Sequence, residues 1–130
     1  MKALSSLLIV AVALGASQAY ADCVYPKAPE KLPDGATAST QEMVDAQKLV
    51  RSYNDQIKAY QDCLRQDHDA KVKADESKPE RNRMSKEERN ELDNITVQKS
   101  NAAYDEAEAL TTRFNEQIRA FKAKGSDKKS

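Results

Sequence analysis

The one histidine of the chain, His68, stands between two acidic residues in the run Asp67-His68-Asp69. Imidazole and carboxylate groups are metal ligands, and a histidine beside a carboxylate is also a common acid–base pair. Consecutive residues of a helix point in different directions, however, so these three side chains cannot all converge on one ion. We therefore predict a solvated helix face here and no metal site.

The rest of the chain shows no catalytic motif. It contains no G-x-S-x-G sequence, and its two cysteines, Cys23 and Cys63, are too far apart for a C-x-x-C redox motif. Pairs of carboxylates need a concave cleft to shift their pKa values, and a two-helix hairpin offers none. We expect no catalytic residue, no cofactor and no enzymatic activity.

Residues 1–21 have the features of a signal peptide. Lys2 supplies the positive charge, residues 7–15 form a short apolar stretch, and Ala19-Tyr20-Ala21 is a cleavage site of the A-x-A type. The apolar stretch is too short to span a membrane, and no later stretch is apolar enough. We predict an exported protein, periplasmic or secreted, with no transmembrane segment in the mature chain. In that oxidising compartment Cys23 and Cys63 are expected to form a disulfide.

Composition limits the possible partners and the size of the core. The chain has 21 basic and 21 acidic residues, so it lacks the basic surplus of a nucleic-acid-binding protein. Charged residues make up 32% of the sequence and aromatic residues only 5%. The core must therefore be thin, and a thin core needs support from a disulfide or from a partner.

Turn and cap signals divide the mature chain into an arm and two helices. Prolines at 26, 29 and 33 disfavour a helix, so residues 22–39 are expected to form an extended arm. Ser39 with Glu42, and Ser85 with Glu88, are capping boxes at which helices begin. The predicted order is a helical hairpin over 40–124, made of a helix at 40–73, a charged connector at 74–85 and a helix at 86–124, and then a basic tail at 125–130.

Apolar residues recur in the two helices at spacings of three and four, which is the pattern of a helix–helix seam. Folding back at the connector places mostly large side chains opposite small ones, as in Tyr53 with Ala107 and Ala46 with Phe114. The fold class is thus all-α, an antiparallel two-helix hairpin with a coiled-coil-like seam. The predicted seam residues are Met43, Val50, Tyr53, Ile57, Tyr60, Leu64, Leu110, Phe114, Ile118 and Phe121.

The arm is long enough to run back along the first helix and reach Cys63. In that position Val24, Tyr25 and Leu32 are expected to cover the groove between the helices as a third layer.

Several of these residues also carry a resemblance. The chain resembles a group of small proteobacterial helical proteins that bear signal peptides and have no assigned activity. The resemblance implies no ligand and no catalytic residue, and the charged connector is longer here than in that group. The residues that carry it are Cys23, Pro33-Asp34-Gly35, Ser39, Met43, Val50, Tyr53, Tyr60, Cys63-Leu64, Phe114-Asn115 and Phe121.

Together these features predict a non-enzymatic exported module that acts through interaction or structure. Its partner is an unknown envelope protein or a second copy of the chain. Tyr104 lies off the seam and is a candidate partner contact. The alternative is a weak binder of metal or of an anionic envelope polymer, which would use the charged connector and the basic tail.

Overall fold

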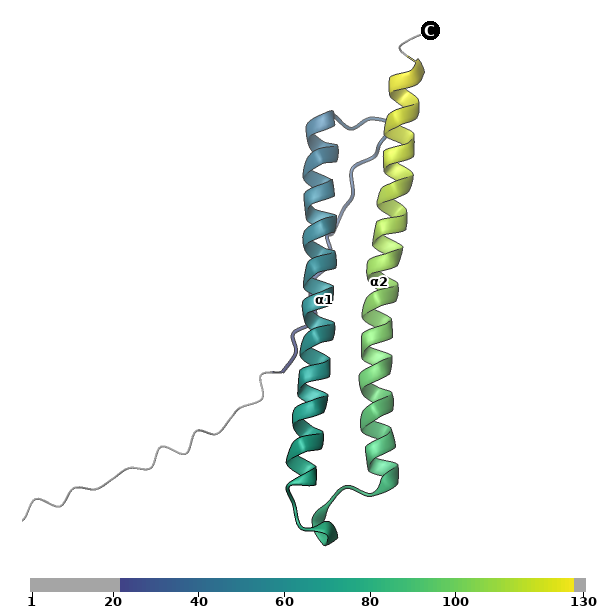
Figure 1. Cartoon of the computed structure of the whole chain (residues 1–130). Helices are drawn as coiled ribbons and strands as arrows, with labels where there is room; N and C mark the ends of the chain where they lie inside the picture. The colour runs from purple at the N-terminus through teal and green to yellow at the C-terminus, as the bar shows by residue number, and fades with distance from the viewer. Residues whose placement is uncertain (1–21, 128–130) are drawn as a thin grey trace, which may run out of the picture.

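The computed structural model describes residues 22–127, and it shows two long antiparallel helices with an extended arm beside them (Figure 1). Helix α1 spans Thr40–Glu76, the short 3-10 helix η1 spans Glu80–Asn82, and α2 spans Lys86–Asp127. No strand occurs in this part of the chain. The predicted all-α hairpin is confirmed. The predicted signal peptide, residues 1–21, and residues 128–130 of the basic tail lie outside the described residues.

Both helices begin at the predicted capping boxes. The Ser39 hydroxyl accepts a hydrogen bond from the Glu42 backbone N–H, and the Glu42 carboxylate accepts one from the Ser39 N–H. Ser85 and Glu88 make the same reciprocal pair at 2.7 and 3.2 Å. Each box satisfies two of the backbone N–H groups that a helix start leaves without a partner.

Both helices end later than predicted. α1 runs to Glu76 rather than to residue 73, because the Ser77 N–H and hydroxyl both donate to the Lys73 carbonyl and close one more turn. α2 runs to Asp127 rather than to residue 124. Gly125 has no positive φ and continues the helix, so it does not form a left-handed cap at the end of α2.

The core is a single seam between α1 and α2. On α1 every predicted seam residue is buried, and Ala46 is buried with them. On α2, Leu110 and Phe114 are buried beside Ala103, whereas Ile118 and Phe121 are half-buried at the edge of the core. The buried α1 residues are Met43, Ala46, Val50, Tyr53, Ile57, Tyr60 and Leu64.

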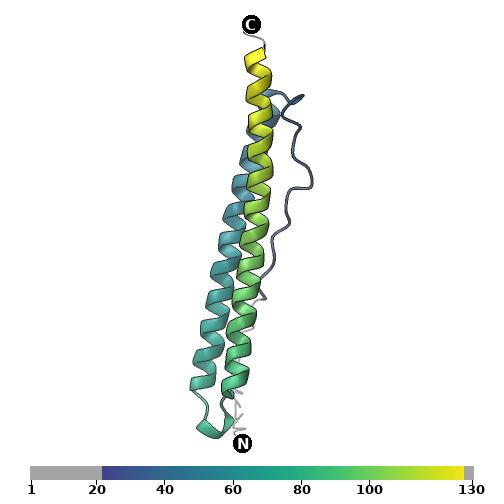
Figure 2. The same cartoon turned by 90° about the vertical axis from the view of Figure 1, so that its right-hand side faces the viewer.

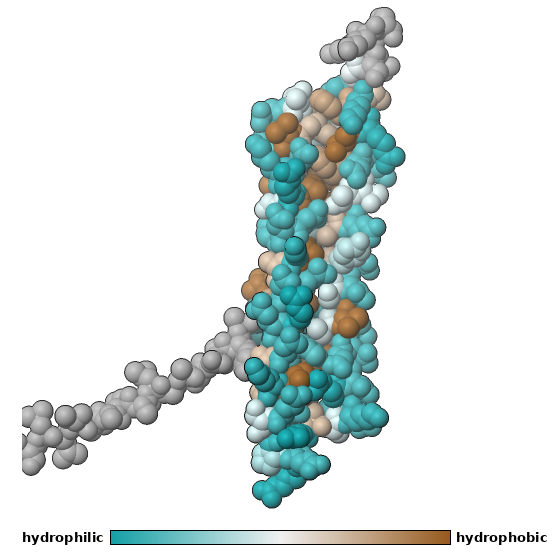
Figure 3. All heavy atoms as spheres, in the orientation of Figure 1, coloured by the Kyte–Doolittle hydropathy of each residue, from teal (hydrophilic) through white to brown (hydrophobic). Residues whose placement is uncertain are grey.

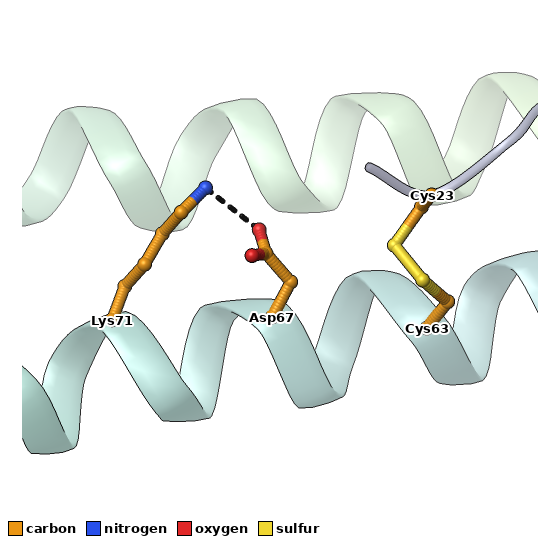
Figure 4. The surroundings of a disulfide bond; sticks show 4 residues. All are labelled: Cys23, Cys63, Asp67 and Lys71. Carbon is orange, nitrogen blue, oxygen red and sulfur yellow. Dashed lines mark hydrogen bonds and ion pairs between the residues drawn. A yellow bond between two sulfur atoms is a disulfide. The ribbon is translucent and has the colours of Figure 1, made fainter. Parts of the chain in front are cut away.

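The arm, residues 22–39, runs back along one face of the hairpin, which we call the covered face (Figure 2). Its first residues are fixed by the predicted disulfide between Cys23 and Cys63, whose Cα atoms are 5.8 Å apart (Figure 4). Leu32 packs against the core, but Val24 is 84% exposed. The prediction that Val24 covers the groove is therefore wrong, since its side chain stays largely exposed beside the anchored Cys23.

The other end of the arm docks on α2 through a tight turn at residues 34–38. Asp34 accepts hydrogen bonds from the backbone of the following residues, and the Gly35 N–H donates to the Gln117 side chain at 2.9 Å. A Cβ atom at position 35 would lie only 1.9 Å from the Gln117 carbonyl oxygen. Only glycine can bring the arm this close to the α2 backbone.

The charged connector at the tip of the hairpin is closed by a buried carboxylate. Asp75 is 5% exposed and accepts the Met84 N–H with both oxygens, at 2.9 and 3.1 Å. Burial disfavours the charged form, but the hydrogen bonds from Met84 and Lys78 outweigh it and hold the pKa of Asp75 below its usual value. Arg83 donates to the carbonyls of Glu76 and Lys78, which fixes the return of the chain into α2.

Candidate functional site

The two faces of the seam differ in what lies beside the apolar residues. On the covered face the arm lays Tyr25, which is 41% exposed, against the hairpin, and its ring packs edge-on against Tyr60 with the ring centroids 5.0 Å apart. The Tyr25 hydroxyl donates to the Glu106 carboxylate at 2.5 Å, so one side chain links the arm to both helices. Burial and the Glu106 charge raise the pKa of Tyr25, and burial likewise raises the pKa of the neighbouring Tyr53. Both tyrosines stay neutral, and Tyr25 packs and donates a hydrogen bond, whereas Tyr53 is a buried packing group whose hydroxyl makes no hydrogen bond within the described residues.

On the opposite face the helices are joined by side-chain hydrogen bonds at seven-residue intervals along α1. Asn54 donates to the Thr111 hydroxyl at 3.1 Å, and Gln61 donates to the carbonyl and hydroxyl of Ser100, both at 3.1 Å. We call this face the open face, because the arm does not reach it. Since residues seven apart return to the same side of a helix, these contacts form a polar ladder beside the apolar seam.

His68 is the last contact of this ladder, toward the tip. Its Nε2 lies 2.6 Å from an Asp93 carboxylate oxygen and its Nδ1 lies 3.3 Å from Asp69. The hydrogen bond to Asp93 is the main cause that raises the pKa of His68, against a smaller opposing effect of burial. The same contact lowers the pKa of Asp93, which also lies 3.5 Å from the Arg89 guanidinium. The solvated face predicted around His68 is therefore a cross-helix contact.

Within residues 22–127 no cluster of three or more histidine, cysteine, aspartate or glutamate side chains has a geometry that could hold a metal ion. His68 and Asp69 are neighbours in space, but Asp67 forms an ion pair with Lys71 at 2.7 Å instead (Figure 4). The run Asp67-His68-Asp69 is thus divided between two faces of α1, as expected for consecutive helical residues.

A long groove runs between α1 and α2 on the open face. It consists of three hollows of about 240, 430 and 450 Å³ that share lining residues: Asn54 joins the first two, and Lys58 and Gln61 join the last two. We call this the open groove. Figure 3 views the hairpin from this face, where apolar surface shows between polar side chains along the line of the helices.

The α2 wall of the open groove carries a second stripe, which is apolar except at Thr111. Val97, Tyr104, Thr111 and Ile118 recur at seven-residue intervals, and each lines one of the hollows. Val97 is 56% exposed and Tyr104 is 57% exposed. A helix with two apolar stripes normally packs against two neighbours, and here α1 accounts for only one of them.

The α1 wall is basic. Arg51, Lys58 and Arg65 recur at the same seven-residue interval and line the same hollows. Asp55 and Asp62 also line the groove, but each follows a basic residue by four positions and lies further round α1 from the seam. Arg65 pairs with Asp62 at 3.0 Å, whereas Arg51 and Lys58 have no ion-pair partner among the described residues.

The sequence predictions found one member of this surface, Tyr104. They missed the polar ladder and the second stripe, although the signal was present as a repeat of seven. Ile118 was assigned to the seam, and the structure places it at the edge of the seam, where it also lines the open groove. The remaining seam residues take part in the core as described above.

Comparison of the chain with known protein families, characterised proteins and solved structures gives no match. In the part of the chain that the structure describes, no helix combines the length and the apolarity needed to cross a membrane.

Proposed function

We propose that this protein is an exported, non-enzymatic interaction module and that the open groove is its working surface. Export is supported by the signal-peptide features of residues 1–21 and by the disulfide between Cys23 and Cys63, which suits an oxidising compartment.

The observation that carries the proposal is the second apolar stripe on α2. The covered face already has its third layer, which is the arm with Tyr25 and Leu32. The open face presents a groove of the same hairpin with Val97 and Tyr104 exposed on its rim. A groove lined by apolar and polar residues at seven-residue spacing fits an α-helix.

The titratable groups with shifted pKa values serve the fold rather than a reaction. Tyr25 ties the arm to α2, His68 ties α1 to α2, and Asp75 closes the tip. Each is engaged with a neighbouring element of the same chain, which supports a structural role for these groups and an interaction role for the protein.

The proposal is tested by photo-crosslinking in the intact envelope. A photoreactive phenylalanine analogue replaces Tyr104 on the open groove, and in a matched control it replaces Leu49, which is 56% exposed on the arm side of α1. We expect a discrete crosslinked adduct from position 104 and none from position 49. Equal adducts from both positions, or none from position 104, would contradict the proposal.

A further inference from the structure

We infer that the disulfide between Cys23 and Cys63 is a reducible tether, and that a dithiol reductant releases arm residues 22–33 from the covered face while the hairpin stays folded. This switch concerns the covered face and does not depend on what binds in the open groove. Three features of the covered face support it: the few contacts that hold residues 22–33, the hollow beside the disulfide, and the hydroxyl that the docked arm leaves without a partner.

Apart from the disulfide, arm residues 24–33 are held by few contacts. In the described part of the chain they make no backbone hydrogen bond to either helix. The Tyr25 hydroxyl supplies their one side-chain hydrogen bond to the hairpin, and Ala28 and Leu32 are only partly buried against the core. Because ordering an extended segment costs conformational entropy at every residue, we expect the disulfide to decide whether this segment stays docked.

The hairpin and the other end of the arm have attachments of their own. The turn at residues 34–38 is held by the Gly35 N–H, which donates to Gln117, and by the Lys124 ammonium group, which donates to the Ala38 carbonyl. The two helices are joined by the buried seam and by the polar ladder. Reduction is therefore expected to free residues 22–33, with the turn as the hinge and both helices in place.

The disulfide is accessible to a reductant from one side. Both cysteines are half-buried, and a hollow of about 340 Å³ lies against Cys63. Asp67, one helical turn beyond Cys63, pairs with Lys71 at 2.7 Å, so its charge is balanced when a thiolate approaches (Figure 4). The residues that line the hollow are Val24, Pro26, Gln56, Ala59, Tyr60 and Cys63.

Reduction by a dithiol takes two exchange steps. One thiolate of the dithiol attacks the Cys63 Sγ from the hollow, the bond between the two cysteine sulfurs breaks, and Cys23 leaves as a thiolate that takes up a proton. The second thiolate of the dithiol then attacks the reductant's own sulfur in the mixed disulfide, and Cys63 leaves in the same way. The dithiol becomes a disulfide and loses two electrons and two protons, which the two cysteines gain. Since Cys23 leaves first, the arm is freed in the first step.

Release of the arm also relieves a cost of the docked state. Tyr53 is 1% exposed, and its hydroxyl has no hydrogen-bond partner within residues 22–127. Glu106 accepts the Tyr25 hydroxyl and also raises the pKa of Tyr53, so the Tyr53 hydroxyl lies close to this arm contact. When the arm leaves, we expect water to reach that hydroxyl and satisfy it. The ring of Tyr60 loses its edge-on partner and joins the surface that is uncovered.

NMR spectroscopy of the isotope-labelled protein, first oxidised and then reduced with excess dithiothreitol, tests the release. Well below the unfolding temperature, the backbone order parameters of residues 24–33 should fall below about 0.6 on reduction, whereas those of α1 and α2 stay near about 0.85. The NOE between the rings of Tyr25 and Tyr60 should be lost. A variant with both Cys23→Ser and Cys63→Ser is the matched control, which should show the released arm with or without dithiothreitol.

Two results of this experiment would overturn the inference. Unchanged order parameters of residues 24–33 in the reduced protein would mean that the disulfide does not decide whether the arm is docked. Loss of ordered signals throughout α1 and α2 would mean that the disulfide holds the whole fold together and cannot act as a local tether.

The rate of reduction tests the access to the disulfide separately. With the hollow as the route, the rate constant for reduction of the folded protein by dithiothreitol should lie within about a hundredfold of that in concentrated urea. Reduction that has to wait for global unfolding is slower than this by a wide margin, since the unfolded fraction of a stable protein is below about one in a thousand. A folded-state rate more than about a hundredfold below the urea rate would therefore overturn the inference.

Discussion

Gly35 lies directly against the α2 backbone. Glycine is required there because a side chain would clash with α2, and not because the backbone has a positive φ. Its φ is not positive, yet a Cβ atom there would lie 1.9 Å from the Gln117 carbonyl oxygen. The turn at residues 34–38 must shift to accept any side chain, and the hydrogen bond from the Gly35 N–H to Gln117 is then lost.

Gly35→Ala is therefore expected to lower the free energy of unfolding by about 1–3 kcal/mol, the usual cost of overpacking. Thermal unfolding followed by circular dichroism measures the change. The matched control is Gly125→Ala, because a Cβ atom at position 125 meets nothing within 4 Å and alanine favours a helix. An equal effect of the two substitutions would show that the close approach does not hold the arm.

His68 gives the hairpin a pH dependence of defined sign. Its pKa is raised in the folded state by Asp93 and Asp69, so the stability that it contributes is fully present below the unfolded pKa of about 6.5. That contribution is lost as the pH rises through the higher pKa of the folded state. The pKa of Asp93 is lowered by the same contact. At a pH below that pKa the Asp93 carboxylate is protonated, and its contact with His68 weakens.

We expect the free energy of unfolding in urea to fall between about pH 5.5 and about pH 8.5 by more in the wild type than in His68→Gln. Glutamine does not titrate in this range, so the difference between the two proteins isolates His68 from every other group. Identical pH dependence in both proteins would mean that the contact between His68 and Asp93 does not form in solution.

At the scale of elements, the arm and its disulfide complete a hairpin whose core is a single seam. The disulfide closes a loop with a sequence separation of 40 between Cys23 and Cys63. It holds Tyr25 against Tyr60 and Glu106 by tethering the residue two positions before it. Without this tether the docking turn at residues 34–38 remains as the other attachment of the arm.

Cys63→Ser is expected to destabilise the protein by up to about 4 kcal/mol, because the unfolded chain is then no longer constrained by the loop. The measurement is the unfolding temperature, which should fall by at least several degrees. Cys23→Ser, which leaves the α1 cysteine in place, should have the same effect. Unchanged unfolding temperatures in both variants would show that the disulfide of the arm does not stabilise the hairpin.

How much of this was predictable from the sequence depends on how far apart the interacting residues are. The capping boxes at Ser39 and Ser85 are local, and the seam follows from the period of each helix, so both were predicted correctly. The exposure of Val24 was not, because it depends on how the arm turns after the disulfide. The contact between His68 and Asp93 requires the register of two helices to within one residue, which apolar periodicity does not define.

The candidate site was harder to predict than the fold for a related reason. The seam draws on large apolar residues, whereas the second stripe mixes Val97 and Tyr104 with the small polar Thr111. Such a stripe looks like ordinary surface until the structure shows that the same residues line one groove. Tyr104 alone was recognised, because an aromatic residue off the seam is conspicuous in sequence.

At the scale of the whole molecule, the hairpin is a rod with its arm along part of one face (Figure 2). The open groove lies on the other face. α2 has 42 residues and is therefore about 63 Å long. A partner bound in the open groove leaves the arm in place, because the two lie on opposite faces of this rod.

Photo-crosslinking from the open groove in the intact envelope tests this account most directly, because it reports whether a protein partner occupies that surface. We predict a discrete adduct from a photoreactive residue at position 104 and none from one at position 49, although Tyr104 and Leu49 are 57% and 56% exposed. Equal adducts from both positions, or no adduct from position 104, would contradict the account.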